Sequence, residues 1–344
     1  MIRVLVVEDS AVTREYLVYL LEQEPKLKIV GTARDGVEAL EQAERLRPDI
    51  ITMDVHMPRM NGYEATRRIM EQVPTPIVMV SASTSREETD IAFEALKAGA
   101  LTLVDKPGGP DHPNHGSTVR TLIETVKLMA EVKVVRRWPR RERPAPPSPL
   151  PVRPSLKIRL IAIGASTGGP QVLAGLLAKL PGDLAAPVLI VQHIASGFTP
   201  GLVEWLSQTT PLRVKVAEPG ESVRSGAVYF APVDFQMGIA ADGRIRLAKE
   251  PAEDGFCPSA SYLFKSVAQS YGGAAIGVLL TGMGRDGAAG LLRLREAGGI
   301  TMAQDEETSV IFGMPAEAIR LGAVQHVLSP DRIAEMICTM VPAG

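Results

Sequence analysis

Seven prolines stand within the sixteen residues from Pro139 to Pro154, and they constrain the fold of this chain more than any other feature. Proline fixes φ and removes a backbone donor, so this stretch forms neither a helix nor a central strand. The 344 residues therefore contain two folded parts, in keeping with about 150 residues per domain. We predict one domain over residues 1–128, a Pro/Arg-rich linker over 129–156 and a second domain over 157–344.

The region around these prolines is strongly basic. Residues 131–157 hold eight Lys or Arg and two Glu, a charge of +6 in a chain whose net charge is −2. We interpret the region as a solvated linker, with a docking site for an acidic partner as the alternative. In polyproline form the sixteen residues span about 50 Å, so the linker does not by itself fix how the domains are oriented.

Composition excludes several classes of protein. With 37 Lys or Arg against 39 Asp or Glu, the chain lacks the basic excess of a nucleic-acid-binding protein, and 45% hydrophobic residues exclude wholesale disorder. Cys257 and Cys338 cannot form a disulfide framework, fit a reducing compartment, and are interpreted as structural. No apolar run approaches the ~18 residues of a membrane helix, and the N-terminus lacks a signal-peptide layout. We expect a cytoplasmic protein without membrane insertion.

Apolar runs alternate with helical patterns in both parts of the chain. The predicted buried strands are Val4–Val7, Leu27–Val30, Ile50–Val55, Ile77–Val80, Leu101–Val104, Ile158–Ile163, Val188–Val191, Ala275–Leu280 and Ile300–Ala303. The helical patterns between and after them include Ala11–Glu22, Gly36–Leu46, Arg86–Ala98, Pro170–Leu180, Ser259–Tyr271, Gly287–Ala297 and Asp331–Met340. Such alternation predicts an α/β protein with two doubly wound parallel sheets. The Asp242-Gly243 pair adds a small antiparallel hairpin.

Polar residues follow four predicted strands of the first part, as Glu8-Asp9, Asp54, Ser81 and Lys106. The carboxyl ends of parallel strands meet at one sheet edge, so three carboxylates gather there and repel one another. Mg²⁺ relieves this repulsion and suits phosphoryl chemistry. Asp54 is then the nucleophile that forms an aspartyl phosphate, while Lys106 and Ser81 contact the phosphate. Any one of these residues alone is more often a cap or turn residue, but the combination is specific.

With Met57-Pro58-Arg59-Met60-Asn61-Gly62 after Asp54, residues 1 to about 128 resemble the receiver domain of two-component response regulators. The resemblance implies a flavodoxin-like fold and phosphorylation of Asp54 by a histidine kinase. It also implies Mg²⁺ bound by Glu8, Asp9, Asp54 and the backbone carbonyl of His56.

The second part contains a candidate nucleophile. Gly164-Ala165-Ser166-Thr167-Gly168 follows a strand and opens a helix, as in the G-x-S-x-G nucleophile elbow; an ordinary turn with a capping serine is the alternative. A serine nucleophile needs a base and an orienting acid. Ser166–Asp286–His326 follows the chain order of α/β-hydrolases. Ser166–His193–Asp286 instead uses a histidine that closes the strand after the serine's own helix. The residues alone leave both open.

A different function is also compatible with the glycines. Gly282-x-Gly284-x-x-Gly287 follows a strand and opens a helix, and Asp305 stands 18 residues after Gly287. This is the layout of a dinucleotide fingerprint with its ribose-binding acid. A receiver fused to a dinucleotide-dependent oxidoreductase is therefore the alternative function. The motif stands late in its domain, however, and leaves Ser166 unexplained.

Four motifs follow the linker in a fixed order: residues 164–170 (Gly-Ala-Ser-Thr-Gly-Gly-Pro), 191–193 (Val-Gln-His), 281–287 (Thr-Gly-Met-Gly-Arg-Asp-Gly) and 303–315. With the receiver, they resemble the chemotaxis protein-glutamate methylesterases, the CheB family, over essentially the full length. The resemblance implies a Rossmann-like catalytic domain with Ser166 as nucleophile, His193 as general base and Asp286 as orienting acid. Backbone N–H groups near Thr167 or Met283 are the candidate oxyanion donors.

The resemblance implies a function. The enzyme demethylates glutamyl γ-methyl esters on chemoreceptors, deamidates receptor glutamines, is controlled by a chemotaxis-type histidine kinase, and needs no cofactor for the esterase reaction. We expect a monomer that binds no nucleic acid. Six positions depart from the pattern of these families: His56, Leu103, Phe235, Gln236, Cys257 and Ser261.

Overall fold

The computed structural model describes residues 1–81, 86–112, 114–132, 134, 158–194 and 197–343. They form two compact units, one before and one after the proline-rich stretch, each with its own sheet. Most of the predicted linker lies outside the described residues, so the domain boundaries stay predictions.

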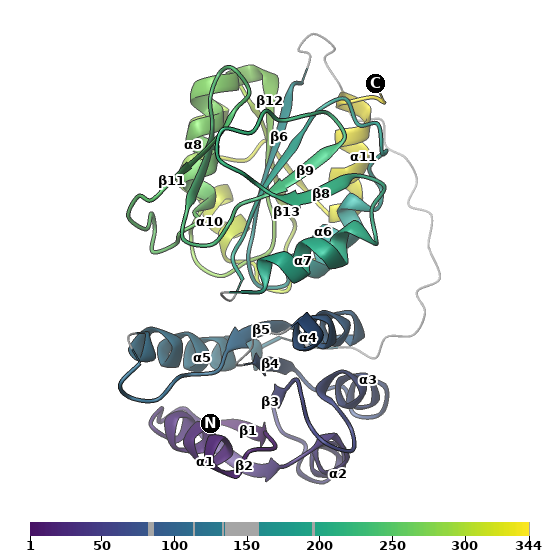
Figure 1. The fold of residues 1–344 in the computed structure, drawn as a ribbon, viewed down its shortest axis with the longest axis vertical. Coiled ribbons are helices and arrows are strands. Elements are labelled where there is room, and N and C mark those ends of the chain that lie inside the picture. Colours follow the sequence, from purple (N-terminus) through teal and green to yellow (C-terminus); the bar gives the residue numbers. More distant parts are fainter. Residues whose placement is uncertain (82–85, 113, 133, 135–157, 195–196, 344) are drawn as a thin grey trace. The chain divides into compact units, whose positions relative to one another are not determined.

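The first unit is a five-stranded parallel sheet in the order β2-β1-β3-β4-β5. Its elements are β1 (Ile2–Val7), α1 (Ala11–Glu22), β2 (Leu27–Ala33), α2 (Gly36–Leu46), β3 (Ile50–Asp54), α3 (Gly62–Gln72), β4 (Ile77–Ser81), α4 (Arg86–Ala98), β5 (Thr102–Asp105) and α5 (His115–Met129). Figure 1 shows α1 and α5 on one face of the sheet and α2, α3 and α4 on the other. The unit is therefore doubly wound, as predicted.

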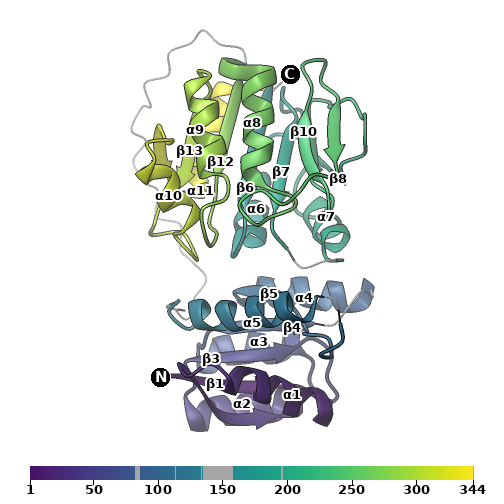
Figure 2. The ribbon, with the colours of Figure 1, turned by 90° about the vertical axis from the view of Figure 1, so that its left-hand side faces the viewer.

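The second unit is a seven-stranded parallel sheet in the order β14-β13-β12-β6-β7-β9-β8, with a separate antiparallel pair β10-β11. Its strands are β6 (Leu160–Ala165), β7 (Val188–Gln192), β8 (Arg213–Val216), β9 (Ala227–Phe230), β10 (Gln236–Ile239), β11 (Ile245–Ala248), β12 (Ala275–Leu279), β13 (Ile300–Gln304) and β14 (His326–Leu328). Its helices are α6 (Gly169–Leu177), α7 (Thr199–Ser207), α8 (Ala260–Tyr271), the short 3₁₀ turn Gly272–Ala274, α9 (Ala288–Glu296), α10 (Met314–Arg320) and α11 (Pro330–Met340). Figures 1 and 2 show α8, α9 and α10 on one face of the sheet and α6, α7 and α11 on the other.

The three central strands of this sheet, β6, β7 and β12, are buried at every residue. Strands that helices cover on both faces carry continuous apolar runs, which is the pattern by which the sequence predicts them. The fold class is confirmed. Three short strands, β8, β9 and β14, were not predicted, and β9 lies between β7 and β8 although β8 precedes it in the chain.

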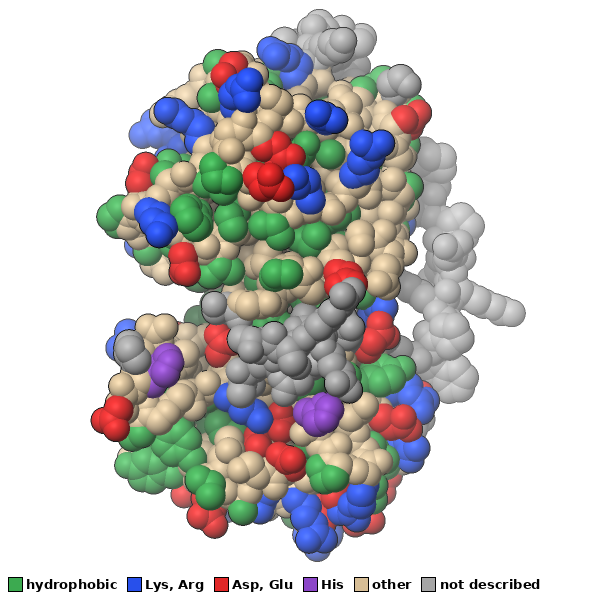
Figure 3. Space-filling model, viewed as in Figure 1, with side chains coloured by type: hydrophobic (Ala, Val, Ile, Leu, Met, Phe, Trp, Pro, Cys, Tyr) green, Lys and Arg blue, Asp and Glu red, His purple; other side chains and the backbone are tan. Residues whose placement is uncertain are grey.

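The surface carries mixed charge. On the faces in view in Figure 3, Lys and Arg side chains intermingle with Asp and Glu on both units. Within the described part of the chain, no helix combines the length and the apolar character that crossing a membrane requires.

Candidate active site

Ser166 lies in the tight turn between β6 and α6. Its backbone N–H donates to Thr281 O at 3.0 Å, and its own carbonyl accepts from Gly169 N at 2.8 Å, which closes the turn. Gly168 has a φ of +78°, and a Cβ there would lie 2.5 Å from Cγ2 of Val310. Only glycine meets both conditions without strain. The glycine after Thr167 therefore allows the turn that presents Ser166 at the sheet edge.

The sheet brings His193 beside this turn. β6 and β7 are parallel neighbours in which Ala165 pairs with Gln192, so Ser166 and His193 each follow a paired residue. The N–H of His193 donates to Ala165 O at 3.0 Å, which extends the ladder by one step. The serine is 8% exposed, so the turn is nearly enclosed but reachable.

The imidazole of His193 is bonded on one side only. Its Nε2 lies 2.9 Å from Oδ2 of Asp286, and its ring stacks on Phe256 with centroids 3.9 Å apart and planes 2° apart. A proton on Nε2 shared with the carboxylate leaves Nδ1 with a free lone pair. Nδ1 is buried, and no described residue forms a hydrogen bond with it. A buried ring nitrogen that can accept a proton is what a general base requires.

Asp286 is fully buried and accepts hydrogen bonds from the start of α8. Donors are Ser259 Oγ at 2.7 Å, Ala260 N at 2.7 Å and Ser261 N at 3.0 Å, and Gly287 N adds a fourth at 2.8 Å. Burial would raise the pKa of Asp286, but His193 and these donors lower it to about 2. The partial positive charge of a helix N-terminus acts in the same direction. The acid next to His193 is therefore held ionised.

A buried glutamine holds the loop that supplies these contacts. Gln236, at the start of β10, donates from Nε2 to the carbonyls of Pro251 and Phe256 and accepts from Ser259 N at 2.8 Å. It therefore supports both the ring under His193 and the cap of α8. The departure from the family pattern at this position is a structural one.

Thr281 is the second residue after β12, and it forms hydrogen bonds with the loops that contain Ser166, Thr167 and Ile311. Its carbonyl accepts from Ser166 N, and its hydroxyl lies 3.0 Å from Thr167 O and accepts from Ile311 N at 3.0 Å. Among the described residues, no backbone acceptor is bonded to the amide of Thr167 or of Met283. The Met283 side chain, in the loop between β12 and α9, is 38% exposed. Both amides remain candidate oxyanion donors.

The rival arrangements find no support in the geometry. His326 lies in β14, where burial lowers its pKa, whereas the histidine bonded to Asp286 is His193. The amide of Gly287, which a dinucleotide fingerprint would offer to a phosphate, donates to Ser261 Oγ at 2.8 Å and to Asp286. Asp305 accepts from Thr308 within its own turn.

Two further departures, Ser261 and Cys257, also lie near this site. Ser261 Oγ accepts from Gly287 N and lies 3.2 Å from Oδ2 of Asp254, so it braces the loop around Asp286. Burial, together with the charge of Asp234, raises the pKa of the Cys257 thiol. A thiol held protonated is a poor nucleophile, in line with a structural role.

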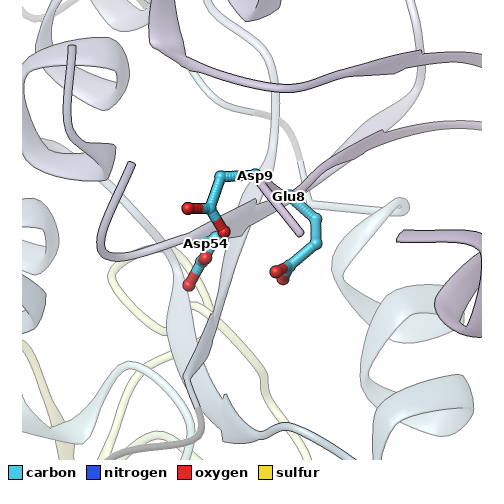
Figure 4. A group of neighbouring side chains, drawn as sticks. All are labelled: Glu8, Asp9 and Asp54. Carbon is cyan, nitrogen blue, oxygen red and sulfur yellow. The ribbon is translucent and has the colours of Figure 1, made fainter. Parts of the chain in front are cut away.

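The first unit gathers its acidic residues at the carboxyl edge of its sheet. Oxygens of Glu8, Asp9 and Asp54 lie within 4.8 Å of one another, at the ends of β1 and β3 (Figure 4). Lys106 Nζ lies 2.8 Å from Glu8 Oε2 and 2.9 Å from Asp54 Oδ1. The N–H of Lys106 donates to the carbonyl of Ser81, which ends β4. The predicted residues are therefore neighbours, while the side chain of His56 is exposed.

Electrostatics at this edge favour an added cation. Burial raises the pKa of both Glu8 and Asp54, and repulsion between the two carboxylates raises that of Glu8 further. For Lys106, the attraction of these carboxylates outweighs burial and raises its pKa. One ammonium against three carboxylates leaves an excess of negative charge, and carboxylate oxygens are the ligands that Mg²⁺ prefers. The residues present fit a Mg²⁺ site.

The sequence alone gave no functional role to six residues that build the second-unit site: Gln192, Gln236, Phe256, Ser259, Thr281 and Gln304, whose Oε1 accepts from Thr281 N at 2.8 Å. They act through backbone carbonyls, amides or ring faces, so no motif for chemistry marks them. Gln192 and Gln304 are the last residues of β7 and β13, and Gln236 is the first residue of β10; a polar residue at the end or start of an apolar strand was the one available signal.

Comparisons with known proteins identify both units. Residues 161–337 match the family described as CheB methylesterase, and residues 4–113 match the response regulator receiver domain. Protein-glutamate methylesterase/protein-glutamine glutaminase 4 of Geobacter metallireducens is 52% identical over 343 residues, 99% of each chain. A Syntrophus aciditrophicus relative of the same description is 49% identical over 98% of this chain and 97% of its own. The crystal structure of the Thermotoga maritima CheB methylesterase catalytic domain superposes with a TM-score of 0.52 and 38% identity, covering 54% of this chain and all of that domain.

Proposed function

The chain belongs to the CheB methylesterase family, and on that premise we propose that Ser166, His193 and Asp286 are its catalytic residues. The protein is a protein-glutamate methylesterase and protein-glutamine glutaminase whose receiver domain places it under phosphorylation control. The observation that carries the proposed site is the His193 ring, which is bonded through Nε2 to a buried carboxylate and whose buried Nδ1 forms no hydrogen bond with any residue that the structure describes. His193 and Asp286 would supply two of the three members of a Ser-His-Asp triad, and Ser166, which follows the adjacent strand, is the proposed third.

In the proposed reaction Ser166 Oγ attacks the carbonyl carbon of a glutamyl γ-methyl ester while Nδ1 of His193 takes the hydroxyl proton. The imidazolium is stabilised by Asp286, which stays ionised. The proton then passes to the methoxy oxygen, the C–O bond breaks, and methanol leaves an acyl-serine ester. Water attacks that ester with the same base, which releases the glutamate carboxylate and restores Ser166.

The oxyanion that forms in each step needs donors. The amides of Thr167 and Met283 flank the serine turn, and we assign them this role. One such donor is worth about 3 kcal/mol in related acyl transfer. A glutamine side chain differs from the ester by an amide nitrogen, which leaves as ammonia after taking the same proton. The glutaminase activity therefore uses the same residues.

Asp54 of the receiver is the proposed phosphorylation site. Its carboxylate attacks the phosphorus of a phosphohistidine on a chemotaxis-type histidine kinase, and the histidine nitrogen leaves. Glu8, Asp9, Asp54 and the carbonyl of His56 are the proposed Mg²⁺ ligands, and a bound Mg²⁺ would supply positive charge beside the phosphoryl oxygens. Lys106 holds one of these oxygens, and Ser81 contacts another.

The proposed substrates are methylated chemoreceptors. The test is methanol release from a methylated receptor fragment by wild type and by Ser166→Ala. We expect the variant to retain less than about a thousandth of the wild-type kcat. Ser207→Ala, which removes a hydroxyl bonded to Glu204 O, is the matched control and should leave the rate unchanged. A serine-directed phosphonate should label wild type and Ser207→Ala but not Ser166→Ala. Esterase activity in Ser166→Ala would overturn the assignment.

A further inference from the structure

A single buried amide lies between the two loops that carry Ser166 and His193. Gln192 is the last residue of β7 and is 6% exposed. Its Nε2 donates to the carbonyl oxygen of Ser166 at 2.8 Å and to that of His193 at 2.8 Å. One –NH₂ group has two hydrogens, so both bonds form at once. The nucleophile and the base therefore share one donor group.

This arrangement couples two segments that the sheet alone leaves independent. The ladder between β6 and β7 ends at the Ala165–Gln192 pair and the hydrogen bond from His193 N to Ala165 O. Beyond it, Ser166 and His193 belong to two separate segments of the chain. A planar amide that bonds the carbonyls of both loops fixes how far apart their backbones stand. Small errors in such a separation matter, because a displacement of about 1 Å can cost on the order of a hundredfold in rate.

The neighbouring helix is shaped to admit this side chain. A Cβ at Gly169 would lie 2.1 Å from Oε1 of Gln192. The second glycine of the Gly168-Gly169 pair is therefore needed for clearance, while Gly168 is needed for its positive φ. Oε1 is buried and bonds no described residue, so the amide is held through its N–H₂ group alone.

We propose that Gln192 is a positioning residue that sets the distance between the nucleophile and the base. The inference rests on the proposed function of Ser166 and His193. It assigns Gln192 no contact with the substrate. Loss of the amide therefore lowers kcat and leaves KM nearly unchanged, because the surface that binds the substrate is not altered.

The test compares Gln192→Leu, which keeps the apolar stem but removes both donors, with Gly169→Ala, which displaces the amide from the helix side. We expect each to lower kcat by at least about tenfold with KM within about twofold of wild type. Leucine lacks Oε1, so the double variant loses the 2.1 Å contact with the added methyl at residue 169, and only the 2.9 Å contact at the Cδ position of residue 192 and the 3.0 Å contact with Cβ of Ala165 are left for small shifts to relieve. The two effects should then be non-additive, and the double variant should resemble Gln192→Leu alone.

Gln325→Leu is the matched control, because the side-chain amide of Gln325 also bonds a backbone group: it accepts from Thr301 N at 2.8 Å. Gln325 directly precedes β14, the edge strand of the sheet, and so lies away from Ser166 and His193. This variant should keep wild-type kcat. All variants are assayed in the full-length protein at a temperature where circular dichroism shows them folded. If Gln192→Leu does not fold, Gly169→Ala carries the test.

Three results would overturn the inference: a kcat for Gln192→Leu like that of the Gln325 control, a loss confined to KM, or multiplicative losses in the double variant. Ser166→Ala is run in the same assay. Activity in that variant would instead remove the proposed function, so the two failures are distinguishable.

Discussion

Replacing Asp286 by Asn separates the charge of this residue from its shape. The carboxylate accepts hydrogen bonds from Ser259, Ala260, Ser261 and Gly287 in addition to His193. An amide of the same size carries no charge and turns an N–H₂ group toward some of these donors. The variant therefore loses both the electrostatic contribution and part of the hydrogen bonding.

The size of the electrostatic part follows from the pKa. The pKa of Asp286 falls from 3.8 to about 2 on folding. At about 1.4 kcal/mol per pKa unit, ionised Asp286 stabilises the second unit by about 2.5 kcal/mol at neutral pH. The folded pKa is the lower one, so this stability is fully present above the unfolded pKa of 3.8 and is lost as the pH falls through about 2. Near pH 3 about half of it remains.

The assay is urea unfolding of wild type and Asp286→Asn at pH 7, 5, 4 and 3. Trp205 on α7 is buried and reports the second unit by fluorescence once Trp138 is replaced by Phe. We expect the gap in unfolding free energy to be constant from pH 7 to 5 and to narrow toward pH 3. A gap of equal size at pH 7 and pH 3 would refute the argument, because the charge would then contribute nothing.

Two further predictions concern the ring beside the base and the receiver. Phe256→Leu removes the ring on which His193 stacks and should lower kcat about threefold to tenfold in methanol-release assays. Phe235→Leu is its control and should leave kcat unchanged, because the Phe235 ring faces Lys249. Equal effects of the two substitutions would argue against the stacking role. Asp54→Asn should abolish the phosphoryl mass increase that acetyl phosphate and Mg²⁺ produce in wild type, and chelation with EDTA should do the same. Asp49→Asn, which alters only a bond from Arg3 N, is its control, and phosphorylation that survives in Asp54→Asn would exclude that residue as the acceptor.

The doubly wound fold class and the central strands could be predicted from the sequence because buried parallel strands are continuous apolar runs. β6, β7 and β12 have that form; Ser166 and His193 directly follow the first two, and Thr281 follows β12 after Leu280, so the three polar residues lie at the carboxyl edge. β8 begins with Arg213 and is only partly buried, so its pattern does not stand out. The position of β9 between β7 and β8 is set by tertiary packing, which periodicity does not encode.

The candidate site was only partly accessible for a related reason. Ser166, His193 and Asp286 are residue types with known chemistry, the first two directly after strands and the third in the loop between β12 and α9, so they could be named before their contacts were known. The residues alone could not choose between His193 and His326, because that choice depends on which ring reaches Asp286. Gln236 acts through backbone groups of a loop without periodicity, and nothing in the sequence places that loop beside the base.

The turn from Gly282 to Gly287 has a consequence for how its charge is supplied. In a nucleotide-binding turn of the same spacing, the backbone amides bind the pyrophosphate of a nucleotide that diffuses in from solution. Here the anion is the side chain of the residue just before Gly287, and it meets the start of α8 as soon as the polypeptide folds. The Asp286 carboxylate therefore occupies these amides in every folded molecule. Neither dilution nor competition with other anions can displace it, because it is part of the chain.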